Sequence, residues 1–150
     1  MHQLFLAPLV VALVVAPVGS AHAEADYASP AAARTIVEEY YKAIDARDYR
    51  TAYRLWGGEG SASGKAYSRF RQGFAQTAHS RVMTDAPVNG DAAMGSVYVD
   101  VPVEVFATLK NGRKQHFRGY YTLRRVNDVD GASSAQLHWH LTSSMLKAAQ

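Results

Sequence analysis

Two histidines close to the carboxyl end have side chains that could bind a metal ion. His138 and His140 alternate with Trp139, so in a β-strand both imidazole rings would project from one face. His116 or Glu104 would then supply a third ligand, because imidazole and carboxylate groups are common ligands of zinc and other transition metals. The alternative is that both histidines face solvent or bond to strand neighbours. We adopt this alternative and expect no metal and no other cofactor.

Two carboxylates could instead take part in proton transfer. Asp100 and Glu104 occupy alternating positions of one strand pattern and therefore share a face. Inside a cavity, loss of water raises the pKa of a carboxyl group and suits it for general acid-base chemistry, with His116 as a further candidate. Valines occupy the opposite face of the same strand. If the valines point to the core, both carboxylates are surface groups, and the sequence leaves this choice open.

Aromatic side chains are abundant and could line a ligand pocket. Tyrosine combines apolar area with a hydroxyl group, which suits a cavity that holds a small hydrophobic molecule. The candidate ligand-binding residues are Tyr40, Tyr41, Trp56, Tyr67, Phe70, Phe74, Tyr120 and Trp139. The alternative is that most of these rings form the hydrophobic core.

Several other chemistries lack the residues they need. The sequence contains no cysteine, which excludes disulfides and thiolate metal sites. It contains neither a glycine-rich nucleotide-binding motif nor a serine nucleophile elbow. The net charge of +3 is small and the basic residues are scattered, so we expect a solvated surface and no nucleic-acid partner.

The first 23 residues have the features of a signal peptide. They contain no Asp, Glu, Lys or Arg, residues 4–18 are almost entirely aliphatic, and Ala21-His22-Ala23 has the form that signal peptidase cleaves. The apolar run is shorter than the roughly 20 residues that span a bilayer. We therefore expect a periplasmic or secreted protein that does not span a membrane after cleavage. Residues 24–29 would be a disordered lead-in, and residues 30–150 one domain.

Helices are expected in the first half of the domain. Ser29 is a good N-cap for Pro30, and apolar side chains recur at three- and four-residue intervals from Ile36 to Ile44. This pattern predicts a helix. We further expect a short helix over 48–56 that ends at Gly57-Gly58, a flexible loop over 59–64, and a third helix over 67–78.

Strands are expected from residue 80 onward, where the apolar period changes to two. Apolar residues at the odd positions of 97–109 predict a long strand that must bend, and Pro102 implies an edge position or a bulge. Asn111-Gly112 is typical of a two-residue type I′ turn into a strand over 113–126. That turn would place Phe106 opposite Phe117, Glu104 opposite Gly119 and Pro102 opposite Tyr121. Shorter strands are expected over 81–88 and 136–145.

The chain resembles the nuclear transport factor 2-like superfamily over residues 30–146. The resemblance is carried by the run Tyr40 to Tyr49, the pairs Ala52-Tyr53 and Leu55-Trp56, the long hairpin, and a closing strand with Trp139. It implies an α+β fold in which N-terminal helices pack in a strongly curved antiparallel sheet, a cystatin-like cone. The superfamily includes ketosteroid isomerases, polyketide cyclases, dehydratases and non-catalytic modules, so the fold does not determine the function.

Three hypotheses for the function are compatible with these features. The first is an exported, non-catalytic binding or interaction module of the cell envelope, whose partner is a small hydrophobic molecule, a peptide or another envelope protein. Its exposed sheet face would be available for a homodimer. The second is a small isomerase- or cyclase-type enzyme, in which a cavity carboxylate moves a proton and tyrosines polarise a carbonyl. A third hypothesis is a purely structural domain that contacts the envelope through its arginines.

Overall fold

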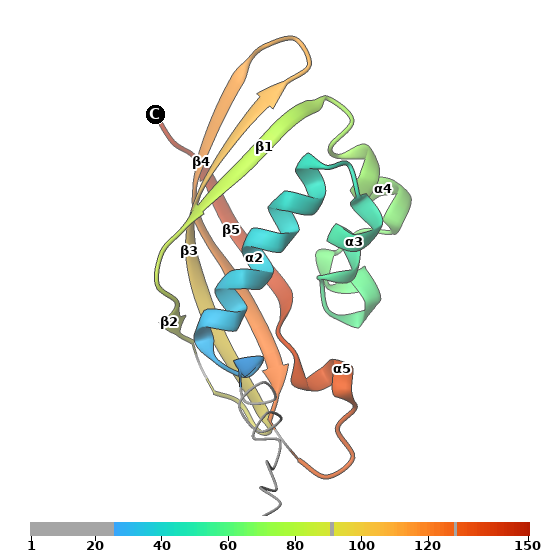
Figure 1. The fold of residues 1–150 in the computed structure, drawn as a ribbon, viewed down its shortest axis with the longest axis vertical. Coiled ribbons are helices and arrows are strands. Elements are labelled where there is room, and N and C mark those ends of the chain that lie inside the picture. Colours follow the sequence, from blue (N-terminus) through green and yellow to red (C-terminus); the bar gives the residue numbers. More distant parts are fainter. Residues whose placement is uncertain (1–25, 91, 128) are drawn as a thin grey trace, which may run out of the picture.

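The computed structural model describes residues 26–90, 92–127 and 129–150. The predicted signal peptide and the start of the lead-in lie outside these residues. Helices pack against one face of a curved antiparallel sheet of five strands, so the expected α+β cone is confirmed (Figure 1). Within the described ranges, no helix is both long enough and apolar enough to cross a membrane.

The longest helix, α2 (Pro30–Asp45), lies along the concave face of the sheet (Figure 1). Ser29 caps it as predicted, because its hydroxyl accepts a hydrogen bond from the backbone N–H of Ala32. The predicted apolar stripe is buried at Val37, Tyr40, Tyr41 and Ile44. A helix of 16 residues is stabilised mainly by the burial of such a stripe against its neighbours.

The next segments differ from their predicted boundaries. Asp48 caps α3 (Tyr49–Arg54) as expected, but the helix gives way at Leu55 because Trp56 forms a bridge to Leu141. The prediction of a flexible loop over 59–64 is wrong. Residues Gly58–Ser63 form η1, a pair of tight 3-10 turns joined by a kink at Glu59 and Gly60.

The third predicted helix is shorter than expected. Helix α4 (Tyr67–Gln72) begins as predicted but ends at Gly73, and Ala78 lies in strand β1 (Thr77–Thr84) instead. Glycine is a poor residue for a helix interior. Pairing of this segment with the long strand β3 therefore outweighs the continuation of the helical pattern.

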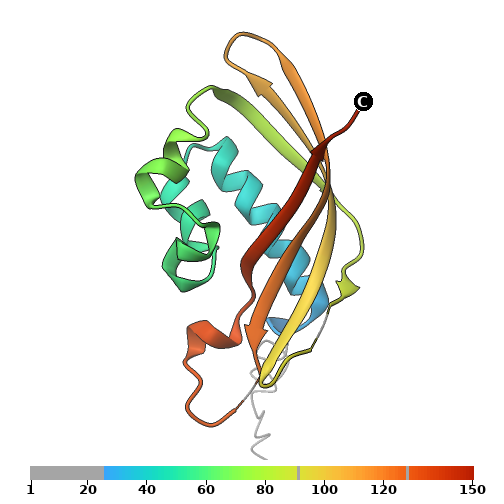
Figure 2. The same ribbon diagram turned by 180° about the vertical axis from the view of Figure 1, so that it is seen from behind.

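The sheet has the strand order β1, β3 (Ser96–Leu109), β4 (Lys114–Val126) and β5 (His140–Ala148), with every pair antiparallel. Figure 2 shows the molecule from behind, with β5 in dark red at the edge of the sheet. Strand β2 (Val88–Asn89) pairs with the other end of β3, so the strand predicted over 81–88 is in fact interrupted after Thr84. Val99, Val101, Val103 and Val105 are buried, which establishes that the valine face of β3 points to the core.

Pro102 lies at a local edge rather than at a bulge in the hairpin. The pairing of β3 with β4 continues without interruption past this residue. On the opposite side, the Asp85 N–H donates to the Pro102 carbonyl oxygen at 3.0 Å, between the end of β1 and the start of β2. A residue's N–H and C=O point to the same side of an antiparallel strand, so the missing donor of Pro102 faces this gap in the pairing.

The hairpin register differs by one residue from the prediction. Leu109 N–H donates to the Arg113 carbonyl across a three-residue loop, in which Gly112 has φ of 85° and Asn111 does not have the positive φ of a type I′ turn. The Asn111 side chain instead accepts a hydrogen bond from the Arg113 N–H. As a result Phe106 lies opposite His116 and not Phe117, Glu104 opposite Arg118 and not Gly119, and Pro102 opposite Tyr120 and not Tyr121.

The last strand begins later than predicted. Residues Ser134–Leu137 form a short helix, α5, because Ser133 and Gln136 bond reciprocally to each other's backbone N–H groups in a capping box. Strand β5 therefore starts at His140 instead of Gln136 and continues to Ala148. His138 is the C-cap of α5 and lies before the strand, so the prediction that His138 and His140 share a strand face is wrong. Trp139 and Leu141 are buried.

Candidate functional site

The interior of the cone is filled by aromatic side chains. The Tyr40 ring lies 5.2 to 6.3 Å, between centroids, from the rings of Tyr41, Trp56, Phe70 and Tyr121. Most of these contacts are edge-to-face, the geometry that aromatic pairs prefer in protein cores. The rings therefore pack against one another and occupy the space where the sequence suggested an internal ligand.

Two phenol groups satisfy each other inside this core. The hydroxyls of Tyr41 and Tyr121 are 2.6 Å apart, and both residues are buried. Burial raises the pKa of Tyr40, Tyr41 and Tyr121 above the ordinary value, because the phenolate would lose its hydration. These tyrosines are thus neutral near pH 7 and can donate hydrogen bonds, but they are poor bases.

The predicted ligand-binding residues separate into three places. Tyr40, Tyr41, Trp56, Phe70 and Trp139 are together in the buried core. Tyr67 and Phe74 belong to the α3–α4 layer, where Tyr67 packs on Tyr53 and Phe74 stacks on Tyr49. Tyr120 lies on the opposite side of the sheet, with its hydroxyl directed to the sulfur of Met145.

The candidate proton-transfer residues lie on the outer face of the sheet. The Glu104 carboxylate is 2.7 Å from Arg118 Nε and 3.2 Å from His116 Nε2. Asp100 accepts a hydrogen bond from the Thr122 hydroxyl at 2.6 Å. Because the valines of β3 point to the core, Asp100 and Glu104 point away from it. Glu104 and His116 are brought together, but outside the cone.

The two candidate metal ligands bond to backbone carbonyl groups. His138 Nδ1 is 2.7 Å from the Ser134 carbonyl oxygen, and His140 Nδ1 is 3.0 Å from that of His138. The His138 ring also stacks on Tyr27. Within the described part of the chain, no group of three His, Asp or Glu side chains has a metal-binding arrangement.

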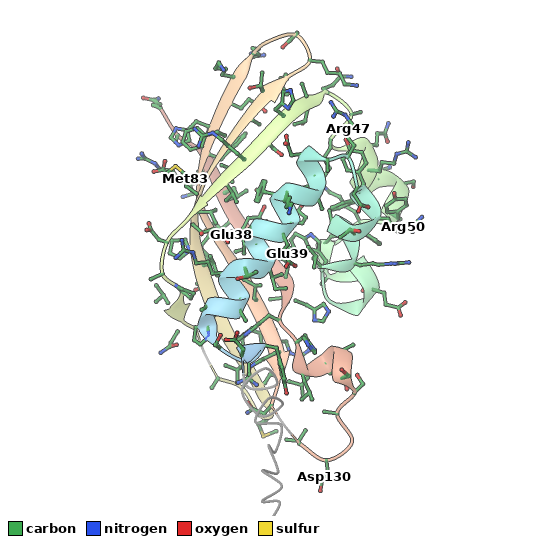
Figure 3. The ribbon with its side chains drawn as sticks, in the orientation of Figure 1. Glu38, Glu39, Arg47, Arg50, Met83 and Asp130 are labelled. Atoms are coloured by element: carbon green, nitrogen blue, oxygen red, sulfur yellow. The ribbon has the colours of Figure 1, made fainter. Side chains whose placement is uncertain are left out.

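The outer face of the sheet carries a stack of charged and aromatic groups. The Arg81 guanidinium lies 4.1 Å from the Phe106 ring centre, and that ring stacks on His116. Met83 and Met145 are also exposed on this face, and Figure 3 shows Met83 pointing away from α2. A homodimer through this face stays a prediction.

An open cleft of about 950 Å³ separates the α3–η1 segment from the end of β4, α5 and the start of β5. We call it the arginine cleft, because four arginines line it: Arg50 and Arg54 from α3, and Arg124 and Arg125 from β4. His140, Ser61, Gln136 and Glu59 are among the other lining residues. In the sequence these arginines look scattered, and a shared site was not expected. The spacing of Arg50 and Arg54, one helical turn apart, was the available local signal.

Backbone hydrogen bonds close the floor of the arginine cleft. The Gly57 N–H donates to the Leu141 carbonyl oxygen, and the Leu141 N–H donates to the Leu55 carbonyl oxygen, both at 2.9 Å. These bonds attach the end of α3 to β5 and hold Trp56 on the core side. The cleft and the aromatic interior are therefore separate environments.

Comparison with solved structures identifies the architecture. The chain is similar to the Kfla4162 protein from Kribbella flavida, with 15% identity over 85% of this chain and 93% of that one and a TM-score of 0.57. It is also similar to two proteins of Novosphingobium aromaticivorans that are named for proposed activities. The first, an aromatic ring hydroxylase by name, has 14% identity, covers 83% of this chain and 94% of that one, and has a TM-score of 0.56. The second, a scytalone dehydratase by name, has 11% identity over 78% of this chain and 81% of that one, and a TM-score of 0.52.

No protein-family model and no curated protein sequence matches the chain. At identities this low, the structural neighbours establish the fold and not the activity. The chain therefore shares with these neighbours an α+β fold in which helices pack against a curved antiparallel sheet, which is consistent with the cone expected from the sequence.

Proposed function

We propose that this protein is an exported, non-catalytic binding module of the cell envelope that takes its ligand in the arginine cleft rather than inside the cone. One observation carries the proposal. Among the described residues, the buried side chains are apolar or aromatic apart from Ser96, so the interior offers no carboxylate and no imidazole. Removal of a proton from a bound substrate needs a base within hydrogen-bond reach of it.

The rival function is a small isomerase or cyclase. It would have to use Asp100 or Glu104 as the base, and both lie across the sheet from the tyrosine pair. Glu104 is also held by Arg118 and His116, and Asp100 by Thr122. The tyrosine pair favours the enzyme, since a neutral phenol can polarise a carbonyl.

Exchange of carbon-bound protons separates these two functions. We would incubate the mature protein with acetophenone and other simple ketones in D₂O and follow loss of the α-proton signals by NMR. The matched variant Tyr41→Phe/Tyr121→Phe lacks both hydroxyls. We expect the wild-type protein and the variant to match the buffer blank. Exchange by the wild-type protein that disappears in the variant would establish the enzyme and overturn the proposal.

A neutral aromatic probe tests whether the interior takes a ligand. We expect 2-naphthol to leave the amide resonances of Val101 and Leu123, which are fully buried in the core, unchanged in two-dimensional NMR spectra. Saturable shifts of these two amides would show that the cone itself is the binding site. The proposal would then be wrong about the place of binding even if no turnover were found.

A further inference from the structure

The charge of the arginine cleft is not balanced by its own residues. Of the side chains that line it, four are arginines and one, Glu59, is acidic. The arginines that form ion pairs among the described residues are Arg34 and Arg118, and neither belongs to the cleft. Asp48 is an acidic neighbour of Arg54. Hydrogen bonds from Thr51 are the main cause of the lowered pKa of Asp48, and the positive charge of Arg54 lowers it further. Guanidinium groups gathered around one cavity repel one another unless an anion joins them.

Two of the guanidinium groups are held in place by their surroundings. Arg124 Nε donates to the Ser96 hydroxyl at 3.0 Å, and Ser96 is itself buried. This bond fixes the plane of the guanidinium and uses neither of its terminal nitrogens. A guanidinium held in this way loses little conformational freedom when it binds an oxyanion with those nitrogens.

Arg125 is held by an aromatic ring. Its guanidinium lies 5.3 Å from the centre of the Trp139 ring, and Trp139 is anchored by a hydrogen bond from its Nε1 to the Ser29 carbonyl oxygen. Arg125 Nε is shielded from solvent and has no hydrogen-bond partner among the described residues. Arg125 Nη1 also donates to the Val126 carbonyl oxygen at 3.4 Å, which further restricts the guanidinium.

The other wall of the cleft supplies charge from a different direction. Arg50 and Arg54 lie one turn apart on α3, and Figure 3 shows Arg50 on the side of α3 that faces away from α2. The Arg50 guanidinium stacks 3.6 Å above the centre of the Tyr67 ring, which is not among the residues that line the cleft. Two walls with separate guanidinium groups, across a volume of about 950 Å³, suit a ligand with more than one anionic group.

We infer that the arginine cleft binds a ligand that carries two or more phosphate or carboxylate groups. This inference rests on the proposed binding function and adds the chemical class of the ligand. Planar guanidinium groups bind both kinds of oxyanion through paired N–H donors. The ligand is either a free small molecule or the headgroup of an anionic lipid, which present the same oxyanion chemistry.

Binding of tripolyphosphate by the mature protein, measured by calorimetry, tests the inference. We expect saturable binding that weakens about tenfold in each of the variants Arg54→Gln and Arg124→Gln, because each removes one charged donor. Arg113→Gln is the matched control. It removes the same charge from the exposed β3–β4 loop, and we expect it to bind like the wild-type protein.

NMR provides a readout that does not depend on the variants. In the wild-type protein, tripolyphosphate should shift the amides of Gly57, Gly58 and Leu141, which line the cleft, and leave that of Asn111 at the hairpin unchanged. Vesicles of phosphatidylglycerol, compared with phosphatidylcholine, identify the source. Retention on the anionic vesicles that Arg124→Gln reduces would identify a lipid headgroup, whereas tripolyphosphate binding alone would identify a soluble ligand.

Two results would overturn the inference. One is absence of tripolyphosphate binding at millimolar concentration, and the other is equal weakening by Arg113→Gln and Arg124→Gln, which would show that only the overall charge matters. Neither result would contradict the proposed non-catalytic function, which the ketone and 2-naphthol experiments test. Conversely, ketone exchange by the tyrosine pair would remove the proposed function while leaving an anion site intact.

Discussion

Tyr41 and Tyr121 show how a polar pair is accommodated in an apolar core. Each hydroxyl is removed from water and is satisfied by the other at 2.6 Å. A hydrogen bond of this kind contributes modestly in net terms, but a buried hydroxyl left without a partner is costly. The stability of the interior should therefore depend on keeping both groups or neither.

The variant Tyr121→Phe tests this dependence. It leaves the Tyr41 hydroxyl buried without its partner, and we expect the free energy of unfolding to fall by about 1–3 kcal/mol in urea titrations. The double variant Tyr41→Phe/Tyr121→Phe should lose less than the sum of the two single variants. Strict additivity in this double-mutant cycle would contradict the pairing.

Alkaline pH provides a second test at the same residues. Burial raises the pKa of Tyr40, Tyr41 and Tyr121 in the folded protein, whereas the unfolded chain ionises its tyrosines near pH 10. Their contribution to stability is therefore complete below about pH 10 and is lost as the pH rises beyond that value. We expect the urea midpoint to fall above about pH 10, and to fall less in Tyr40→Phe. A midpoint that is flat to higher pH would show that these phenols are not protected by the fold.

At the scale of elements, β4 and β5 approach each other closely at Gly119. A Cβ atom at this position would overlap the carbonyl oxygen of Met145 in β5. The pairing of the same two strands also contains an irregularity between Thr122 and Leu123. Bulges and glycines are common ways of curving a sheet, and here they let the sheet bend around α2.

Gly119→Ala tests this close approach. The added methyl group forces β5 away from β4, and we expect a loss of about 3 kcal/mol of unfolding free energy, at the upper end of the usual cost of overpacking. Gly57→Ala is the matched control, because a Cβ there would meet its nearest atoms at 3.7 Å, an ordinary contact distance. Equal thermal stability of the two variants would show that the strands can separate at no cost.

At the scale of the whole molecule, the fold divides the protein into a filled interior and an open cleft. Most of the aromatic residues that suggested an internal ligand site pack in the hydrophobic core. The arginines that are scattered in the sequence line one cleft between α3 and β4. Backbone bonds between the α3–η1 segment and β5 separate the two regions. This division is the reason for placing the proposed ligand site outside the cone.

The predicted export concerns the whole chain. It can be tested by identifying the first residue of the mature protein. We expect the full-length protein, expressed in a bacterial host with a periplasm, to be recovered from that compartment with Glu24 as its first residue. A variant in which Ala21 and Ala23 are replaced by leucine should remain uncleaved, because signal peptidase requires small side chains there. Recovery of unprocessed wild-type protein from the cytoplasm would exclude the exported module.

Local patterns in the sequence were enough to predict the capped α2 helix, the long β3 strand with its valine face, and the order of helices before sheet. These features depend on residues close together in the chain: Ser29 with Pro30, apolar spacing within α2, and alternation within β3. The α+β cone followed from them and from the superfamily resemblance. The end of α4 and the start of β5 could not be predicted from the local pattern. Pairing of β1 with β3 ends the helical segment early, and the capping box of α5 delays the start of β5.

The hairpin register and the site could come only from the tertiary structure. Asn111-Gly112 is compatible with two loop lengths, and a change of one residue altered every cross-strand partner from Phe106 to Pro102. Whether Tyr40 and Trp56 line a cavity or fill it depends on volumes contributed by six separate elements, which no local pattern records. The arginine cleft likewise joins residues about 70 positions apart, because long-range packing alone places α3 across the cleft from the end of β4.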